Sequence, residues 1–189
     1  GPTRAGALFV LALLGAFLAR PPLMALLAAP DDARARSWLL AYSACAAAGL
    51  GGLLALYARW GLVPLCVPAT AILAVSLWFT ARRRAMSAAH ELLGVAGLSL
   101  GAPGAHYAAS GTWTPEAAWL WVLCLLFFTG PVFHVKMLVL GRIAERAGRA
   151  AAHSVVFHLT ALAVVVTGVM AAGLPAVAVV PFLAALAKT

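Results

Sequence analysis

The chain has 189 residues, of which 65% are hydrophobic and only 10% are charged, and its formal net charge is +8. Soluble domains carry about 25% charged residues, so this composition excludes an ordinary soluble domain. The basic residues lie in short gaps between apolar runs and not on one solvated face, which argues against a nucleic-acid-binding protein. The composition therefore predicts a protein with several membrane-spanning segments.

Apolar runs that are long enough to cross a bilayer recur along the whole chain. A span needs roughly 20 apolar residues, because the hydrocarbon core is about 30 Å thick. Continuous apolar runs favour helices over barrel strands, whose sequences alternate. We expect an all-α polytopic transmembrane helix bundle with about seven spans, at 5–19, 38–58, 61–80, 89–109, 115–139, 153–172 and 174–187.

The beginning of the sequence, GPTRAGALFV, has no initiator methionine. We therefore expect residues 1–189 to form a single integral membrane domain that lacks its native N-terminal segment. Arg20 and two prolines follow the first apolar run without a small-residue cleavage site, so that run is interpreted as a span and not as a signal peptide.

The basic residues are distributed unequally between the two sides of the predicted bundle. Only Arg4 and Arg59 fall on the side of the N-terminus. The other eleven are Arg20, Arg34, Arg36, Arg82, Arg83, Arg84, Lys136, Arg142, Arg146, Arg149 and Lys188. Cytoplasmic loops carry an excess of Lys and Arg, so we expect the eleven-residue side to face the cytoplasm across the inner membrane.

The entry to the fourth predicted span combines arginines with a histidine and a glutamate. Ser87 is a candidate N-cap, which puts Glu91 in the first turns, where a negative charge complements the helix dipole. Arg82 to Arg84 lie just upstream, where they can pair with Glu91 or bind lipid phosphates. One interpretation is charge anchoring at the interface. The other places His90 and Glu91 in a polar site, because ionisable groups in a membrane usually have a partner or a task.

The same span contains a stripe of glycines. Gly94, Gly97, Gly101 and Gly104 recur at spacings of three and four residues, which aligns them on one helix face. Small residues let helices approach closely in a membrane, so we favour helix packing over a substrate-lining groove. Pro103 is expected to kink the helix near its outer end.

The fifth predicted span is interrupted by Gly130 and Pro131, and His134 and Lys136 follow in its cytoplasmic half. The proline can free a backbone carbonyl. Lys136 is long enough to snorkel toward the interface, so its position alone proves little. His134 is too short to do so, and its role is either to line a polar cavity or to bond a neighbouring helix.

Common enzyme motifs are absent from the sequence: there is no P-loop, GxSxG, HExxH or GxGxxG. His153 and His158 are five residues apart and so lie on different helix faces, with no acidic ligand nearby. Cys45, Cys66 and Cys124 show no metal-binding spacing and are interpreted as buried structural thiols. We therefore expect neither a metal nor another cofactor.

Three blocks of sequence resemble the YwiC-like membrane proteins: FLARPPLMALL, RRRAMSAAHELLGVAGLSLGAPGAHYAASG and AAWLWVLCLLFFTGPVFHVKMLV. The resemblance extends from about Gly6 to the end and rests on the order of these blocks, on Arg-Pro-Pro after a span and on Glu-Leu-Leu-Gly at 91–94. It implies an integral membrane protein without a defined biochemical activity. Members usually begin with a segment containing Glu-His-Gly, which this chain lacks.

A more distant similarity is to UbiA-type prenyltransferases, helical bundles that hold a prenyl diphosphate through magnesium bound by two aspartate-rich loops. The corresponding loops here would be 20–36 and 142–149. Holding magnesium requires clustered carboxylates, but these loops offer only Asp31 and Asp32 in one and Glu145 in the other. The Pro-Asp-Asp context of the first loop is instead typical of turns and helix caps.

Three functional hypotheses follow from these patterns. The first is an inner-membrane protein that binds or moves a small or lipidic molecule; the others are a UbiA-like transferase with degenerate metal motifs and a structural or assembly protein. The predicted partners are the lipid bilayer and such a ligand, not nucleic acid, and the oligomeric state is left open. The candidate binding residues are Arg82, Arg83, Arg84, His90, Glu91, His134 and Lys136.

Overall fold

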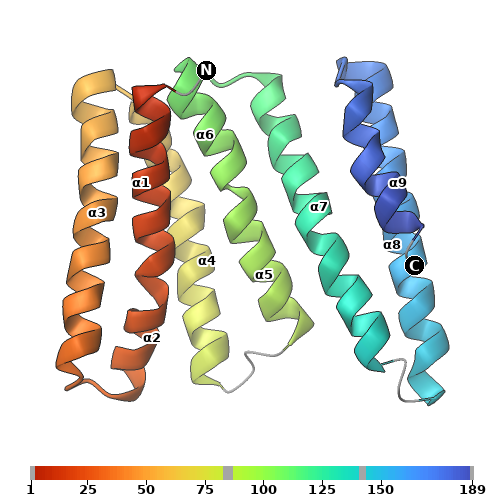
Figure 1. Ribbon diagram of the computed structural model, residues 1–189, viewed down its shortest axis with the longest axis horizontal. Coiled ribbons are helices and arrows are strands. Elements are labelled where there is room, and N and C mark those ends of the chain that lie inside the picture. Colours follow the sequence, from red (N-terminus) through yellow and green to blue (C-terminus); the bar gives the residue numbers. More distant parts are fainter. Residues whose placement is uncertain (1–2, 83–86, 141–143, 188–189) are drawn as a thin grey trace.

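The structure, a computed structural model, describes residues 3–82, 87–140 and 144–187. Every regular element in these ranges is helical, which confirms the predicted all-α fold. The helices stand side by side, with α1 and α3 at one edge and α8 and α9 at the other (Figure 1). They are α1 (Arg4–Leu18), α2 (Arg20–Ala28), α3 (Ala33–Tyr57), η1 (Trp60–Leu62), α4 (Val63–Ala81), α5 (Ala88–Ser99), α6 (Gly101–Ser110), α7 (Pro115–Leu140), α8 (Ala144–Ala172), η2 (Ala176–Val179) and α9 (Val180–Leu186).

Five helical segments of the described chain are long and apolar enough to cross a membrane. They are Arg4–Ala28, Ala33–Tyr57, Trp60–Ala81, Pro115–Val139 and Ala151–Ala172. The predicted fourth span is divided into α5 and α6, and the predicted seventh corresponds to a shorter apolar helix, Ala176–Leu186. A membrane protein is therefore supported, while the number of seven spans stays a prediction.

The first helical segment extends further than the sequence predicts. The expected span ended at residue 19, but α2 continues directly from α1 to Ala28. Pro21 and Pro22 lie in the first turn of α2, where a missing backbone N–H costs little helical bonding. Arg20 was expected in a connection and lies instead inside this continuous segment.

A break divides the predicted fourth span between α5 and α6. Leu100 separates the two helices, and Pro103 follows three residues later. Proline has no N–H to donate to the carbonyl of Ser99, so the helical bonding pattern is interrupted at this level. The helix is thus disturbed one turn before Pro103, in the region where the sequence predicts a kink.

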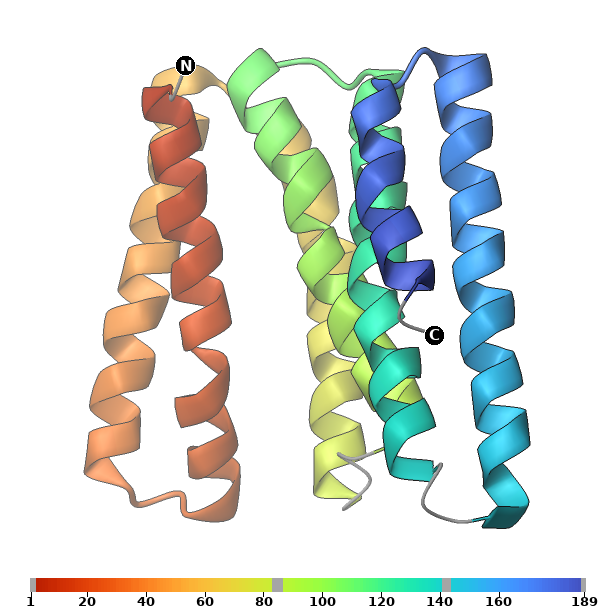
Figure 2. The ribbon, with the colours of Figure 1, turned by 45° about the vertical axis from the view of Figure 1, so that its right-hand side comes forward.

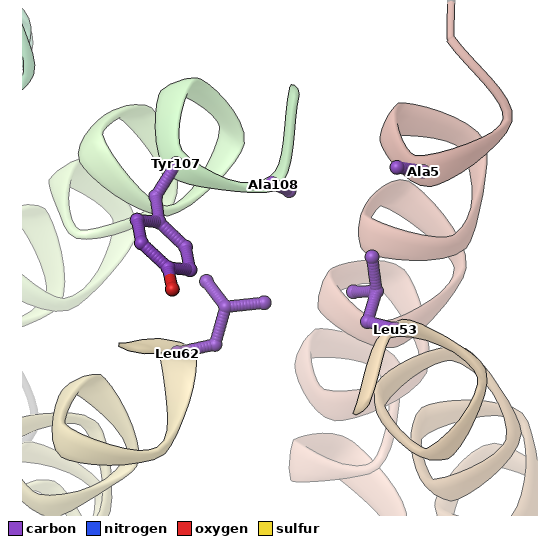
Figure 3. Packing of buried hydrophobic residues seen from close by; sticks show 5 residues of the cluster. All are labelled: Ala5, Leu53, Leu62, Tyr107 and Ala108. Carbon is purple, nitrogen blue, oxygen red and sulfur yellow. The ribbon is translucent and has the colours of Figure 1, made fainter. Parts of the chain in front are cut away.

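One cluster of buried apolar residues lies at one end of the bundle and joins α1, α3, η1 and α6. Figure 3 shows this cluster, which consists of Ala5, Leu53, Leu62, Tyr107 and Ala108. The Tyr107 hydroxyl also accepts a hydrogen bond from the backbone N–H of Gly61 over 3.0 Å. These contacts fix α6 against the start of α4, and the α5–α6 segment thereby keeps its place in the row of helices.

A close approach between two backbones joins α1 to α3. A Cβ on Gly15 would lie 2.6 Å from the backbone nitrogen of Ala46, and a Cβ on Gly49 would lie 2.5 Å from that of Ala12. Because these contacts are to backbone atoms, no side-chain movement can relieve them. Two glycines on facing helices therefore set the spacing of this pair.

The cysteines differ from the sequence interpretation. Cys45 and Cys66 are exposed and Cys124 is half-buried, so the prediction of buried thiols is wrong for the first two. Large apolar side chains are also exposed, among them Leu56 and Met170. In a membrane protein such surfaces face lipid, so an apolar segment of sequence does not require burial within the protein.

Candidate functional site

A polar cluster joins α2, α4 and α5 within the bundle. It consists of Arg20, Ser76 and His90 and is called the polar cluster below. Arg20 Nη2 donates to Ser76 Oγ over 2.8 Å and lies 3.2 Å from His90 Nε2, and Ser76 Oγ lies 3.0 Å from the same His90 nitrogen. Ser76 is buried, whereas Arg20 and His90 are half-buried. Each of the three helices thus supplies one polar side chain, and the three side chains contact one another.

The donors and acceptors of the polar cluster limit how its hydrogen bonds can be arranged. A guanidinium has only donors, so His90 Nε2 must accept from Arg20. The Ser76 hydroxyl accepts from Arg20, and its own proton can share the single lone pair of the same His90 nitrogen with Arg20. A protonated Nε2 would direct its N–H at the guanidinium and break this arrangement.

Local sequence explains how the three side chains are positioned. Ser87 caps α5, and its hydroxyl oxygen accepts from the backbone N–H of His90 over 3.3 Å, as the sequence predicts. On α4, Thr80 Oγ1 donates to the carbonyl of Ser76 over 3.1 Å. Arg20 is the first residue of α2, next to its two prolines. Two of the three residues of the polar cluster, Arg20 and His90, therefore lie in the first turn of a helix.

The charge of Arg20 is not neutralised by any carboxylate in the described part of the chain. The ion pair found there joins Lys136 Nζ and Glu91 Oε2 over 3.0 Å, and it links α7 to α5. About one third of each of these two side chains is exposed, 29% for Lys136 and 34% for Glu91. Among the described residues, the ion-pair partner of Glu91 is thus Lys136 and not Arg82, although Arg82 lies nearer in the sequence.

The three-arginine run is only partly described. Arg82 follows the last residue of α4, and its guanidinium carbon lies 5.6 Å from the centre of the Trp78 ring, a cation–π distance. Arg83 and Arg84 lie outside the described residues. Their predicted role in binding stays a prediction.

The remaining candidate, His134, lies apart from the polar cluster. It lines a pocket between α7, α8 and α9 whose volume is about 390 Å³. Lys136, two residues further along α7, contacts α5 instead. The described candidate residues therefore occupy four places: the end of α4 beside Trp78, the polar cluster, the Glu91–Lys136 ion pair and this pocket.

The glycine stripe does not lie against a single backbone. A Cβ on Gly97 would lie 3.0 Å from Ile72 of α4, and one on Gly101 would lie 3.2 Å from Leu13 of α1. A Cβ on Gly104 would lie 2.6 Å from the Phe9 ring, whereas nothing lies within 4 Å of Gly94. Three of the four glycines thus make room for side chains of two different helices.

Two members of the polar cluster, Arg20 and Ser76, were not among the sequence candidates. A signal existed for Arg20, since Arg-Pro-Pro fits the first turn of a helix as well as a loop. No comparable signal marks Ser76, a lone serine in an apolar run. Asp32, considered for metal binding, accepts from the backbone N–H of Ala35 over 2.9 Å and caps α3.

Comparison with known proteins supports the resemblance seen in the sequence. The family model for YwiC-like protein matches residues 1–106. The match covers the first helices and the polar cluster. It ends before the Trp- and Phe-rich block at 117–139, which is one of the three blocks that carry the resemblance in the sequence. Neither the curated proteins nor the solved structures contain a match. Since the model covers more than half of the chain, the protein belongs to the YwiC-like family.

Proposed function

We propose that this protein resides in a bacterial inner membrane and binds or moves a small or lipidic molecule that carries an acidic group. The observation that supports this most directly is the half-buried guanidinium of Arg20, which bonds Ser76 and His90 but no carboxylate of the described chain. A cation within a membrane is costly and usually has a partner or a function. A carboxylate or phosphate of the ligand would supply that partner.

The depth of the polar cluster fits an amphiphilic ligand. Arg20 lies eight residues before the end of α2 at Ala28, which corresponds to about 12 Å of helix. Ser76 lies five residues before the end of α4, and His90 lies in the first turn of α5. At this level, below a membrane surface, the acidic group of a lipid or lipid-like molecule could reach Arg20 while its apolar part remains among the helices.

The neighbouring ion pair supports the same assignment. Glu91 and Lys136 neutralise each other, so the pair adds no net charge beside the polar cluster. Glu91 therefore does not compensate Arg20, although it follows His90 directly in the sequence. The excess positive charge that remains for a ligand belongs to Arg20.

The test replaces Arg20 and compares it with a matched arginine. Arg36 lies exposed on α3 at the same end of the bundle, where it donates to the carbonyl of Pro30 over 3.1 Å. Native mass spectrometry of gently solubilised protein should detect an acidic amphiphile on the wild type and on Arg36→Ala. We expect Arg20→Ala to lose it, since a charged hydrogen bond contributes about 1.5–3 kcal/mol.

A second substitution separates binding from folding. Arg20→Lys keeps the charge but removes the forked donor geometry, so we expect weaker retention rather than none. Thermal unfolding in the same detergent identifies any variant that is simply misfolded. Equal retention of the same molecule by Arg20→Ala and Arg36→Ala, with both variants folded, would refute the proposal.

A further inference from the structure

A second site is suggested by the pocket between α7, α8 and α9, none of whose lining residues belongs to the polar cluster. Figure 2 shows α9 lying against α7 and α8 on the far side of the molecule from α1 and α3. The lining is mostly apolar and includes the rings of Phe127, Phe157 and Phe182. Its polar side chains are His134 and His158.

His158 presents an unused acceptor at this pocket. Its side chain is 4% exposed, and Nδ1 lies 2.8 Å from the carbonyl oxygen of Ser154. A carbonyl oxygen only accepts, so Nδ1 carries a proton, and in the neutral ring Nε2 is then an acceptor. Among the described residues no donor lies within hydrogen-bond distance of Nε2.

A glycine of α7 allows this nitrogen to lie close to the α7 backbone at the pocket wall. A Cβ on Gly130 would lie 3.3 Å from His158 Nε2, and Gly130 itself lines the pocket. The next residue, Pro131, has no N–H, so the carbonyl of Phe127 lacks its regular helical donor. Of the two polar side chains that line the pocket, the buried one, His158, thus has an acceptor nitrogen without a donor.

We propose that this pocket binds an apolar molecule that carries a hydroxyl group, and that this hydroxyl donates to His158 Nε2. An acceptor without a donor in an apolar pocket is costly, and a hydroxyl is an uncharged group that satisfies it. The volume of about 390 Å³ lies at the lower end of small-molecule pockets and suits one ring with a short chain. The phenylalanine rings provide an aromatic surface for such a ring.

The position of His158 indicates that the ligand enters from the lipid. His158 lies seven residues after Ala151, where the apolar part of α8 begins, or about 10 Å along the helix. A molecule that is mostly apolar reaches this depth by partitioning into the bilayer. The site differs in chemistry from the proposed one at Arg20, which attracts an acidic group.

The experiment compares two probes that differ only in the donor, 2-fluoro-4-hexylphenol and its methyl ether. ¹⁹F NMR titration of the purified full chain in detergent should give about tenfold tighter binding of the phenol, since the ether leaves the acceptor unsatisfied. His158→Phe keeps a ring and removes Nε2, so we expect it to bind both probes equally. His153→Phe on the same helix, at an exposed position, should keep the tenfold preference.

The outcomes that would overturn the proposal are specific. Equal binding of phenol and ether by the wild type would show a nonspecific apolar pocket. Loss of the preference in His134→Phe but not in His158→Phe would show that His134, and not His158, accepts from the hydroxyl. Ala185→Trp fills the pocket from α9 without changing His158, so both probes should be lost, and unchanged binding would place the probes elsewhere. This variant and the wild-type ratio also decide the question if His158→Phe does not fold.

Discussion

Glu91 illustrates how the partner that the sequence suggests for a charged residue can differ from the one found among the described residues. The sequence offers Arg82 to Arg84 on its N-terminal side, but the structure pairs Glu91 with Lys136 of α7 over 3.0 Å. The cap at Ser87 starts α5 at Ala88 and so puts Glu91 in the first turn, where its charge complements the helix dipole. The ion pair explains its orientation toward α7. Both effects act at once, so Glu91 stabilises the start of α5 and joins it to a neighbour.

The coupling between Glu91 and Lys136 can be measured by a double-mutant cycle. Glu91→Gln and Lys136→Met remove one charge each, and the double variant removes both. We expect a coupling free energy of about 1 kcal/mol in the unfolding free energy, because both side chains are about one third exposed and therefore partly screened. Unfolding in mixed detergent micelles provides the measurement. A coupling indistinguishable from zero would reduce the pair to an incidental contact.

The residues of the polar cluster show what a sequence can and cannot indicate at this scale. His90 was a candidate because an ionisable group entering an apolar segment is unusual. Its partners are 70 residues away at Arg20 and 14 residues away at Ser76. Neither separation is a local spacing, so no helical pattern connects them. Only the packing of α2, α4 and α5 brings the three together.

At the scale of elements, composition and proline chemistry predicted most helices but not every boundary. Residues 115–139 were predicted as a span and form α7 almost without change. The first span was predicted too short because Arg-Pro-Pro was interpreted as a loop, whereas prolines in a first turn permit a helix to restart. The same three letters fit both structures. In the structure these residues are helical, and the helix that they start, α2, packs against α3.

Glycine gives a sharper example, since its role depends on what faces it. The predicted stripe on α5 and α6 accommodates side chains, while the backbone contact falls at Gly15 and Gly49 on α1 and α3. Those two glycines belong to different helices and share no sequence pattern. The sequence of one helix, without knowledge of the helix that packs against it, therefore does not reveal which glycine is essential.

The α1–α3 contact predicts unequal effects for two glycines of the same helix. Gly49→Ala should destabilise the fold by about 1–3 kcal/mol, because the new methyl group would overlap the backbone of α1 at Ala12 and Leu8. Gly51→Ala is the matched control, since nothing lies within 4 Å of its Cβ position and alanine favours a helix. Thermal unfolding in detergent should separate the two variants. A neutral Gly49→Ala would show that the two helices can move apart at no cost.

For the whole molecule, the described basic residues preserve the asymmetry seen in the sequence. Arg34, Arg36 and Arg82 lie at the end of the bundle where α2 joins α3 and where α4 ends, as Figure 1 allows the reader to follow. Arg4 and Arg59 lie at the opposite end, where α1 begins and α3 ends. Since cytoplasmic sides are enriched in Lys and Arg, we expect the first end to face the cytoplasm.

Thiol labelling from the two sides of the membrane tests this orientation. Asp31→Cys lies in the connection between α2 and α3, and Thr112→Cys lies in the connection between α6 and α7 at the other end. Both positions are exposed. With Cys45, Cys66 and Cys124 replaced by alanine, a membrane-impermeant maleimide should label Thr112→Cys in spheroplasts and Asp31→Cys in inverted vesicles.

The orientation also decides from which side the polar cluster is reached. Arg20 and His90 lie nearer the end marked by Asp31, so labelling of Asp31→Cys from outside would place the proposed acidic ligand on the external leaflet. That result would contradict the charge argument, because the basic end would then face away from the cytoplasm. Labelling in inverted vesicles would instead put Arg20 at the leaflet that carries anionic lipids, where an acidic amphiphile is available to it.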